Sequence, residues 1–147
     1  MTGRFAVRGA TAADLETLRA WLDAAGLPSA DLSKSLLPNF LVATDGAGDV
    51  GAVGIEQFGA TGLLRSLVVV KRKRGIGAGS FLLSSLEEAA RTNGVRELWL
   101  LTIDAQAYFQ QHGYRVRRRE AAPAPIRGTA EFRDLCPADA ALMSKKI

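Results

Sequence analysis

The chain alternates between short apolar runs and stretches in which apolar residues recur at helical spacing. Apolar runs bounded by turn residues are typical of strands. They lie at residues 5–8, 40–44, 50–58, 63–70, 97–102, 114–118 and 129–135. Helical spacing predicts a first helix from Thr11 to Gly26, a short one over 31–37, one that follows Gly79 and ends at Asn93, and one over 105–112.

The connections between these elements predict a mixed sheet. Short turns join the strands 40–44, 50–58 and 63–70, which indicates an antiparallel meander. A helix joins the strand 63–70 to the strand 97–102, and a helical crossover implies that these two strands are parallel. We therefore expect a single domain over residues 1–147, of the α/β (α+β) class, with a mixed, mostly antiparallel sheet.

The helix after Gly79 is amphipathic, so its apolar residues share one face and its charged residues the other. The expected buried set is Leu82, Leu83, Leu86, Ala89 and Ala90, and the expected exposed set is Glu87, Glu88 and Arg91. At the first helix, Thr11 followed three residues later by Asp14 predicts a capped N-terminus.

Composition narrows the class of protein. Of the 147 residues 48% are hydrophobic, which suits a globular core, and no apolar run is long enough to cross a membrane. The N-terminal residues do not resemble a signal peptide, and the single cysteine, Cys136, cannot form an internal disulfide, so we expect a cytoplasmic protein. A net charge of +4 is too small to indicate nucleic acid by itself, and no residue cluster indicates a metal site.

A glycine-rich basic turn separates the strand 63–70 from the helix that follows it. It reads Arg74-Gly75-Ile76-Gly77-Ala78-Gly79 and comes directly after Lys71, Arg72 and Lys73. Glycines let the backbone approach a ligand closely, and a helix N-terminus presents free N–H groups, so this turn can hold a phosphate. The glycines are two residues apart throughout, which excludes a dinucleotide fingerprint, and no Lys-Ser or Lys-Thr follows, which excludes a P-loop.

The turn and its setting resemble the GNAT acetyltransferases (GCN5-related N-acetyltransferases). The acetyl-CoA loop of that family begins with Gln or Arg, has a glycine three residues later and Gly or Ala two residues after that. Arg74, Gly77 and Gly79 match this pattern. Residues 105–114 also resemble the second signature of the family, a helix that ends in Gly-Phe or Gly-Tyr. The resemblance covers the chain from residue 5 to residue 135.

The resemblance implies an N-acetyltransferase with acetyl-CoA (CoA) as donor, helices on both faces of the sheet, and a β-α-β core that binds the donor. The backbone of Leu67, Val68 and Val69 would pair with the pantetheine arm. Arg74 and the backbone of Gly75, Ile76, Gly77, Ala78 and Gly79 would hold the pyrophosphate. Thr102 would contact the donor from a position at which the family often has Asn. A homodimer is a further expectation of the resemblance.

A narrower resemblance is to the ArsN-type branch, whose members tend to be encoded near arsenic-resistance genes. It rests on residues 63–69, 100–102 and 132–137. This likeness favours a small-molecule amine as the acceptor, such as a toxic amino-acid-like compound. A protein N-acetyltransferase and a CoA-binding regulatory module without turnover stay open as alternatives, whereas a nucleic-acid partner lacks a known motif.

Acyl transfer requires a neutral amine, and deprotonating a lysine-like amine at pH 7 costs roughly 4.6 kcal/mol, so a carboxylate base would help. Glu56 is the candidate base, because the family often has an acidic residue on this strand. With residues 59–62 as the turn, Glu56 would lie opposite Arg65, and a cross-strand ion pair would explain both residues without catalysis. Arg65 is alternatively a receptor for an anionic group of the substrate.

Tyr108 is the candidate general acid for the departing thiolate. Many relatives have a tyrosine four residues before the glycine of the second signature, where this chain has Phe109. One residue along a helix rotates a side chain by ~100°, so a tyrosine that only packs in the core is the alternative for Tyr108. His112 and Cys136 are expected to be structural.

Overall fold

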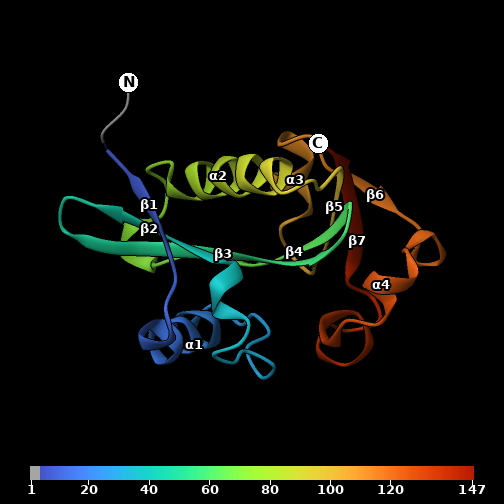
Figure 1. Cartoon of the computed structure of the whole chain (residues 1–147), viewed down its shortest axis with the longest axis horizontal. Coiled ribbons are helices and arrows are strands. Elements are labelled where there is room, and N and C mark those ends of the chain that lie inside the picture. Colours follow the sequence, from blue (N-terminus) through green and yellow to red (C-terminus); the bar gives the residue numbers. More distant parts are fainter. Residues whose placement is uncertain (1–3) are drawn as a thin grey trace.

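The computed structural model describes residues 4–147, and it shows one seven-stranded sheet with helices on both faces (Figure 1). Residues 1–3, which begin the segment expected not to be a signal peptide, lie outside the described residues. The strands are β1 (Ala6–Gly9), β2 (Phe40–Asp45), β3 (Gly48–Phe58), β4 (Thr61–Val69), β5 (Glu97–Thr102), β6 (Arg115–Arg117) and β7 (Ala141–Lys146). The α-helices are α1 (Leu15–Ala24), α2 (Ala78–Thr92), α3 (Gln106–Gln111) and α4 (Ala124–Arg127). No helix among the described residues is long and apolar enough to span a membrane.

The strand order in the sheet is β1-β2-β3-β4-β5-β7-β6. The strands β2, β3 and β4 form the expected antiparallel meander. The pairing of β4 with β5 is parallel and the other pairings are antiparallel, so α2 is the expected crossover helix. The fold class predicted from the sequence is therefore confirmed.

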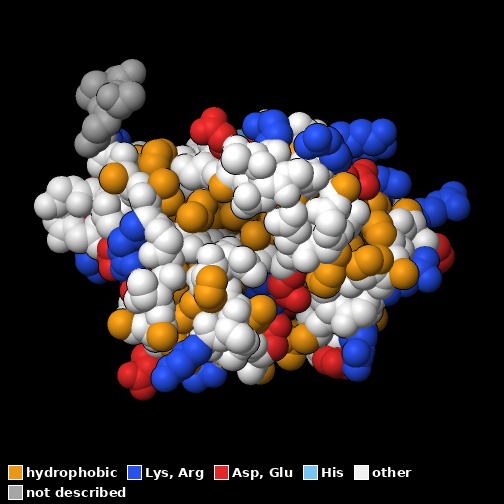
Figure 2. All heavy atoms as spheres, in the orientation of Figure 1, with side chains coloured by type: hydrophobic (Ala, Val, Ile, Leu, Met, Phe, Trp, Pro, Cys, Tyr) orange, Lys and Arg blue, Asp and Glu red, His pale blue; other side chains and the backbone are white. Residues whose placement is uncertain are grey.

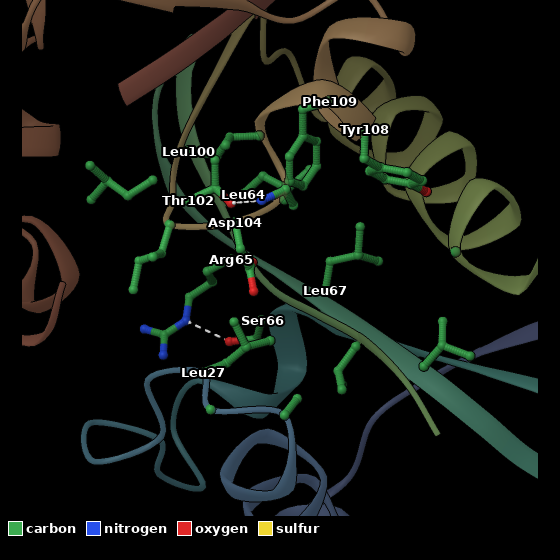
Figure 3. Close-up of a pocket in the computed structure, with 18 of the residues that line it drawn as sticks. Leu27, Leu64, Arg65, Ser66, Leu67, Leu100, Thr102, Asp104, Tyr108 and Phe109 are labelled. Atoms are coloured by element: carbon green, nitrogen blue, oxygen red, sulfur yellow. Dashed lines mark hydrogen bonds between the residues drawn. The ribbon is translucent and has the colours of Figure 1, made fainter. Parts of the chain in front are cut away.

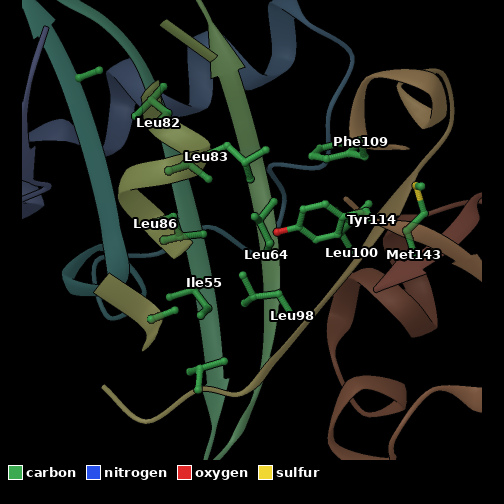
Figure 4. Packing of buried hydrophobic residues seen from close by; sticks show 14 of the residues in the cluster. Ile55, Leu64, Leu82, Leu83, Leu86, Leu98, Leu100, Phe109, Tyr114 and Met143 are labelled. Atoms are coloured by element: carbon green, nitrogen blue, oxygen red, sulfur yellow. The ribbon is translucent and has the colours of Figure 1, made fainter. Parts of the chain in front are cut away.

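Helices cover both faces of the sheet (Figure 1). On one face α2 packs with Leu82, Leu83 and Leu86 against Leu64 and Leu98 of the central strands (Figure 4). On the opposite face α1 packs with Leu18 and Leu22 over the meander, and α4 packs over the far end of the sheet. The residues of that last cluster are Leu63, Trp99, Ala122, Ile126 and Leu142. Burial on both faces explains why the central strands are almost continuously apolar.

The C-terminal part differs from the expectation. Residues 129–135 are not a strand: a π-helical turn, Glu131–Leu135, follows α4 there. The Thr129 hydroxyl donates to Ile126 O at 2.8 Å and accepts from Phe132 N at 3.3 Å, which continues the helical path of the chain. The last strand is instead β7, which lies between β5 and β6 and is antiparallel to both.

Two local expectations also change. The segment 31–37 forms turns and no α-helix, followed by a short 3-10 helix at Leu37–Asn39. The β3–β4 turn consists of Gly59 and Ala60 alone, since Phe58 pairs with Thr61, and Gly59 has φ of +64°. A two-residue hairpin with a left-handed glycine suits the strand twist.

Glu87 on α2 is buried, against the expectation that it is exposed. Its Oε2 accepts a hydrogen bond from the Tyr114 hydroxyl at 2.9 Å, and Lys145 Nζ lies 3.0 Å from its Oε1. Tyr114 directly precedes β6, a strand that the sequence predicted, and Lys145 belongs to β7, which it did not predict, so the burial of Glu87 depends in part on the unpredicted strand.

Candidate active site

A gap between β4 and β5 forms the centre of the site. The two strands pair only where they begin, over Thr61–Leu63 and Glu97–Trp99. Beyond this point β4 runs on to Val69 and β5 to Thr102 without pairing to one another. A pocket of about 730 Å³, a volume typical of sites for small ligands, is lined by these unpaired parts of the strands (Figure 3).

A bulge in β4 accompanies the divergence of the strands. Ser66 and Leu67 together lie opposite the single residue Val53 of β3. Ser66 has φ of +60°, a left-handed conformation that is rare for residues other than glycine. A bulge bends its strand and increases the local twist, so β4 turns away from β5 at this point.

The backbone of β4 beyond the bulge is available to a ligand. Val70 N donates to Val50 O of β3 at 2.9 Å, and successive residues of a strand direct their backbone groups to opposite sides, so Leu67 and Val69 face the gap. The carbonyl of Val69 accepts a hydrogen bond from Arg74 Nε at 3.0 Å instead of one from a strand. An extended ligand can therefore pair with β4 as a further strand would.

The glycine-rich turn lies at one end of the pocket. Gly75 and Gly77 have φ of +83° and +93°, and Gly77 is the N-cap of α2. An αL glycine directly before a helix exposes consecutive N–H groups at the positive end of the helix dipole, which is a typical anion site. Arg74 and Lys73 line this end of the pocket, and Lys73 also pairs with Asp45 at 2.9 Å.

Tyr108 lines the pocket from α3, beside α2 (Figure 3). Its hydroxyl is buried, and no group of residues 4–147 forms a hydrogen bond with it. A buried hydroxyl without a partner costs roughly 1–3 kcal/mol, so a ligand atom is the natural partner for this one. Phe109 packs in the core with 6% of its surface exposed, and the ring of His112 lies 4.6 Å from that of Tyr108.

Arg65 lies in the pocket wall away from α2 (Figure 3). Its side chain is fully buried, and four of its five N–H groups are used. Nη1 donates to Asp31 at 2.6 Å and to Glu56 at 2.9 Å, Nη2 donates to Asp31 at 2.7 Å, and Nε donates to Ser66 at 3.1 Å. The hydrogen bonds from Arg65 lower the pKa of Asp31. Little of this guanidinium is left for an anionic substrate group.

Glu56 forms the ion pair with Arg65 that the sequence suggested, although the register differs from the expected one. In the sheet Leu63 lies opposite Glu56, and the pair runs diagonally between β3 and β4. The shorter turn at Gly59 shifts the register by two residues. Glu56 does not line the pocket, so the structure does not bring this candidate base to the gap.

Glu131 does line the pocket, and sequence reasoning missed it. Its side chain is 5% exposed and its Oε2 lies 3.4 Å from Arg65 Nε. Burial, with the nearby charges of Asp31 and Glu56, raises the pKa of Glu131 to about 7 against the opposing effect of Arg65. The local signal was weak: Glu131 lies between Ala130 and Phe132 in a segment that was expected to be a strand.

Two further residues complete the wall. Cys136 is half-buried and faces the same pocket, and burial raises the pKa of its thiol to about 11, so it is a neutral thiol near pH 7. The hydroxyl of Thr102 accepts a hydrogen bond from Ala105 N at 3.0 Å, which caps the end of β5 beside the pocket.

Comparison with known proteins agrees with this geometry. The family described as the acetyltransferase (GNAT) domain matches residues 37–116, which include the meander, the glycine-rich turn, α2, β5 and α3. No curated protein sequence matches the chain.

Several solved structures share the fold. N-acetylglutamate synthase from Neisseria gonorrhoeae, complexed with coenzyme A and N-acetyl-glutamate, superposes with a TM-score of 0.86 at 17% identity over 99% of this chain. The chain spans only 36% of the length of that synthase. Rv2747 from Mycobacterium tuberculosis, in complex with CoA, gives 0.80 at 20% identity, covering 97% of this chain and 99% of that one. An acyl-CoA N-acyltransferase from Klebsiella pneumoniae, described as putative, gives 0.75 at 24% identity over 99% of both chains.

Proposed function

Because the chain belongs to the GNAT acetyltransferase family, we propose that it transfers the acetyl group of acetyl-CoA to the primary amine of a small molecule. The observation that carries this proposal is the continuous pocket, which runs from the N-terminus of α2 along the free edge of β4 to a buried cluster of carboxylates. One end suits the phosphates of the donor, and the other end suits an amine.

The residues of the donor end fit CoA. The N–H groups of Gly75, Ile76, Gly77, Ala78 and Gly79 would bind the pyrophosphate, helped by Arg74. The backbone groups of Leu67 and Val69 would pair with the pantetheine arm, whereas the expected pairing of Val68 is corrected, because its backbone groups face β3. Thr102 would close the gap from β5. When bound, acetyl-CoA supplies an activated thioester. The chain itself would contribute an extended slot that holds this thioester beside the acceptor.

Tyr108 is the proposed general acid. Its unpartnered hydroxyl lies beside Gly79 in the first turn of α2, where it is close to the proposed path of the pantetheine arm. A phenol in this place can protonate the departing thiolate of CoA.

A small acceptor is favoured over a protein by the walls of the pocket. Leu27 and Pro28, which follow α1, form one side of the acceptor end, and Glu131 and Cys136 form another. Because these walls come from separate segments, they enclose a compact ligand from several sides. The ArsN-type likeness makes arsenic- and phosphorus-containing amino acids worth testing as acceptors. The homodimer stays a prediction, which sedimentation equilibrium can check.

Two measurements test the proposal. Acetyl-CoA at millimolar concentration should raise the melting temperature by several degrees, and a lack of any shift would remove the donor assignment. Thiol release from acetyl-CoA should then be followed across a panel of amines, amino acids and lysine-containing peptides. Turnover with small amines supports the proposal, turnover with peptides alone would redirect it to a protein acceptor, and binding without turnover would favour a regulatory module.

A further inference from the structure

The acceptor end of the pocket carries an excess of negative charge. The single positive charge of Arg65 is surrounded by three carboxylates, those of Asp31, Glu56 and Glu131, at 2.6 Å, 2.9 Å and 3.4 Å. Asp104 also lines the pocket and adds a further carboxylate. On the face shown in Figure 2, acidic side chains gather between the parts that carry α1 and α4 in Figure 1. This end therefore attracts cations, in contrast to the basic end formed by Lys73 and Arg74.

Within this cluster Glu131 is the carboxylate that receives no hydrogen bond from the described residues. Asp31 and Glu56 receive hydrogen bonds from Arg65, whereas no group of residues 4–147 donates one to the side chain of Glu131. The π-helical turn holds the glutamate in place through the hydrogen bond from Cys136 N to Glu131 O at 2.9 Å. A buried carboxylate that faces a pocket and lacks a donor is ready to accept one from a ligand.

We propose that the acceptor binds as an ammonium ion against Glu131 and that Glu131, not Glu56, takes its proton. This inference rests on the proposed function and names both the acceptor class and the base. Within the panel of amines, the inference favours a cationic amine without an anionic group beside it over the amino acids named above. Arg65 then acts as a positioning residue, because it binds Asp31 and Glu56 and its positive charge offsets the repulsion among the three carboxylates.

The proton balance is complete with the groups of the site. The ammonium donates one proton to Glu131, and the neutral nitrogen forms a bond to the acetyl carbon. The carbon–sulfur bond breaks, and the CoA sulfur receives a proton from Tyr108. The second nitrogen proton returns through water to the Tyr108 oxygen. Glu131 then releases its proton to solvent, so the products are an amide, the CoA thiol and one proton.

Burial supports this role for Glu131. A carboxyl group with a pKa of about 7 is ionised in half of the molecules at neutral pH and is a far stronger base than an ordinary glutamate. The charged or titratable groups around it are Arg65, Asp31, Glu56 and the thiol of Cys136.

The test compares three variants, using the amine of the panel that the wild-type enzyme acetylates best. Glu131→Gln should lower kcat/KM at pH 7 by about a hundredfold or more. Its remaining activity should rise tenfold per pH unit towards the pKa of the amine, because the variant can use only the fraction of amine that is already neutral in solution. Glu56→Gln should keep the wild-type inflection near pH 7. Asp134→Asn is the matched control, since its carboxylate lies on the same turn with 62% of its side chain exposed, and it should behave as wild type.

Two readouts are independent of that profile. The side-chain carboxyl carbon of Glu131, assigned in the carbon-13 spectrum by its loss in Glu131→Gln, should titrate near pH 7. A titration near pH 4.5 would overturn the proposal. The enzyme should also acetylate 1,4-diaminobutane at least tenfold more efficiently than 4-aminobutanoate, which has the same chain length, and the reverse preference would contradict a cationic acceptor.

The outcomes separate this inference from the proposed function. If the wild-type enzyme binds acetyl-CoA but acetylates no amine, the proposed function fails and the role of Glu131 fails with it. If it acetylates amines and Glu131→Gln keeps the wild-type rate and pH profile, only the inference is wrong. Loss of the inflection in Glu56→Gln alone would return the base to Glu56.

Discussion

The hydroxyl of Tyr108 on α3 lies 3.0 Å from the point at which a β carbon would stand on Gly79 of α2. The glycine therefore leaves the space that this buried oxygen occupies. The acetyl-CoA loop of the family accepts either Gly or Ala at this position, so the requirement for glycine comes here from the tyrosine.

Alanine at residue 79 should displace Tyr108 and lower turnover. The hydroxyl would have to move by a few tenths of an ångström, and a misplaced catalytic group can cost about tenfold in kcat. The free energy of unfolding should change by less than ~1 kcal/mol, because alanine also favours the helix. Thiol-release kinetics and chemical denaturation measure both quantities. In a Tyr108→Phe background the Gly79→Ala change should cost no further activity, and additive losses would contradict this explanation.

Gly77 should be required for donor binding, and Gly94 offers a control. Both have left-handed φ, +93° and +90°, and neither has an atom within 4 Å of an added β carbon. Alanine at either position should cost about 1–2 kcal/mol of stability through backbone strain. Only Gly77→Ala, which disturbs the N-cap of α2, should also lose the rise in melting temperature with acetyl-CoA. Equal loss in Gly94→Ala would show that strain, and not the loop, controls binding.

The meander and the crossover could be predicted because their signals are local. Apolar runs with short turns define β2, β3 and β4, and the glycine-rich turn marks the start of α2. The last strand gave no such signal. In β7 the apolar residues Leu142 and Met143 precede Ser144 and two lysines, while Phe132 and Leu135 upstream resemble a strand more closely. The partners on β5 and β6 decide which segment joins the sheet, and sequence spacing does not contain them.

The two ends of the site also differ in how far local sequence signals could predict them. The proposed donor end consists of neighbouring residues from Arg74 to Gly79, so a single sequence motif indicated it. The acidic end brings together Asp31, Glu56, Arg65 and Glu131 from four separate segments. The Glu56–Arg65 pair was within reach of a strand-pairing argument. Glu131 was not, because its position depends on α4 and the π-helical turn folding over the sheet.

Glu87 should contribute strongly to the stability of the fold, although the sequence pattern places it on the exposed face of α2. Its carboxylate accepts a hydrogen bond from the Tyr114 hydroxyl and forms an ion pair with Lys145. In Glu87→Ala both partners would lose this carboxylate. A buried donor left without its charged acceptor costs about 1.5–3 kcal/mol. Urea denaturation should show this loss for Glu87→Ala and less than about 0.5 kcal/mol for Glu88→Ala, the exposed neighbour. Equal effects would mean that the buried contacts carry no net stability.

Glu131 should make the protein less stable as the pH rises towards 8. Its pKa is raised from 4.5 to about 7 on folding, so the folded state binds this proton more tightly than the unfolded chain. The resulting stabilisation is complete below pH 4.5 and is lost as the pH rises through 7. A shift of this size corresponds to about 3 kcal/mol in the free energy of unfolding.

Comparison with Glu131→Gln isolates this effect, because the other carboxyl groups titrate in both proteins. A hydrogen bond from Arg8 lowers the pKa of Asp14 to about 2. The stabilisation from this pair is present above the unfolded pKa of Asp14 and is lost only in strong acid. That pH range lies below the range in which Glu131 titrates. The stability of the variant relative to wild type should therefore increase by up to about 3 kcal/mol between pH 5 and pH 8. Denaturation curves at closely spaced pH values measure the difference. Parallel stability profiles for wild type and Glu131→Gln would show that this carboxyl group is not held protonated by burial, whatever its role in turnover.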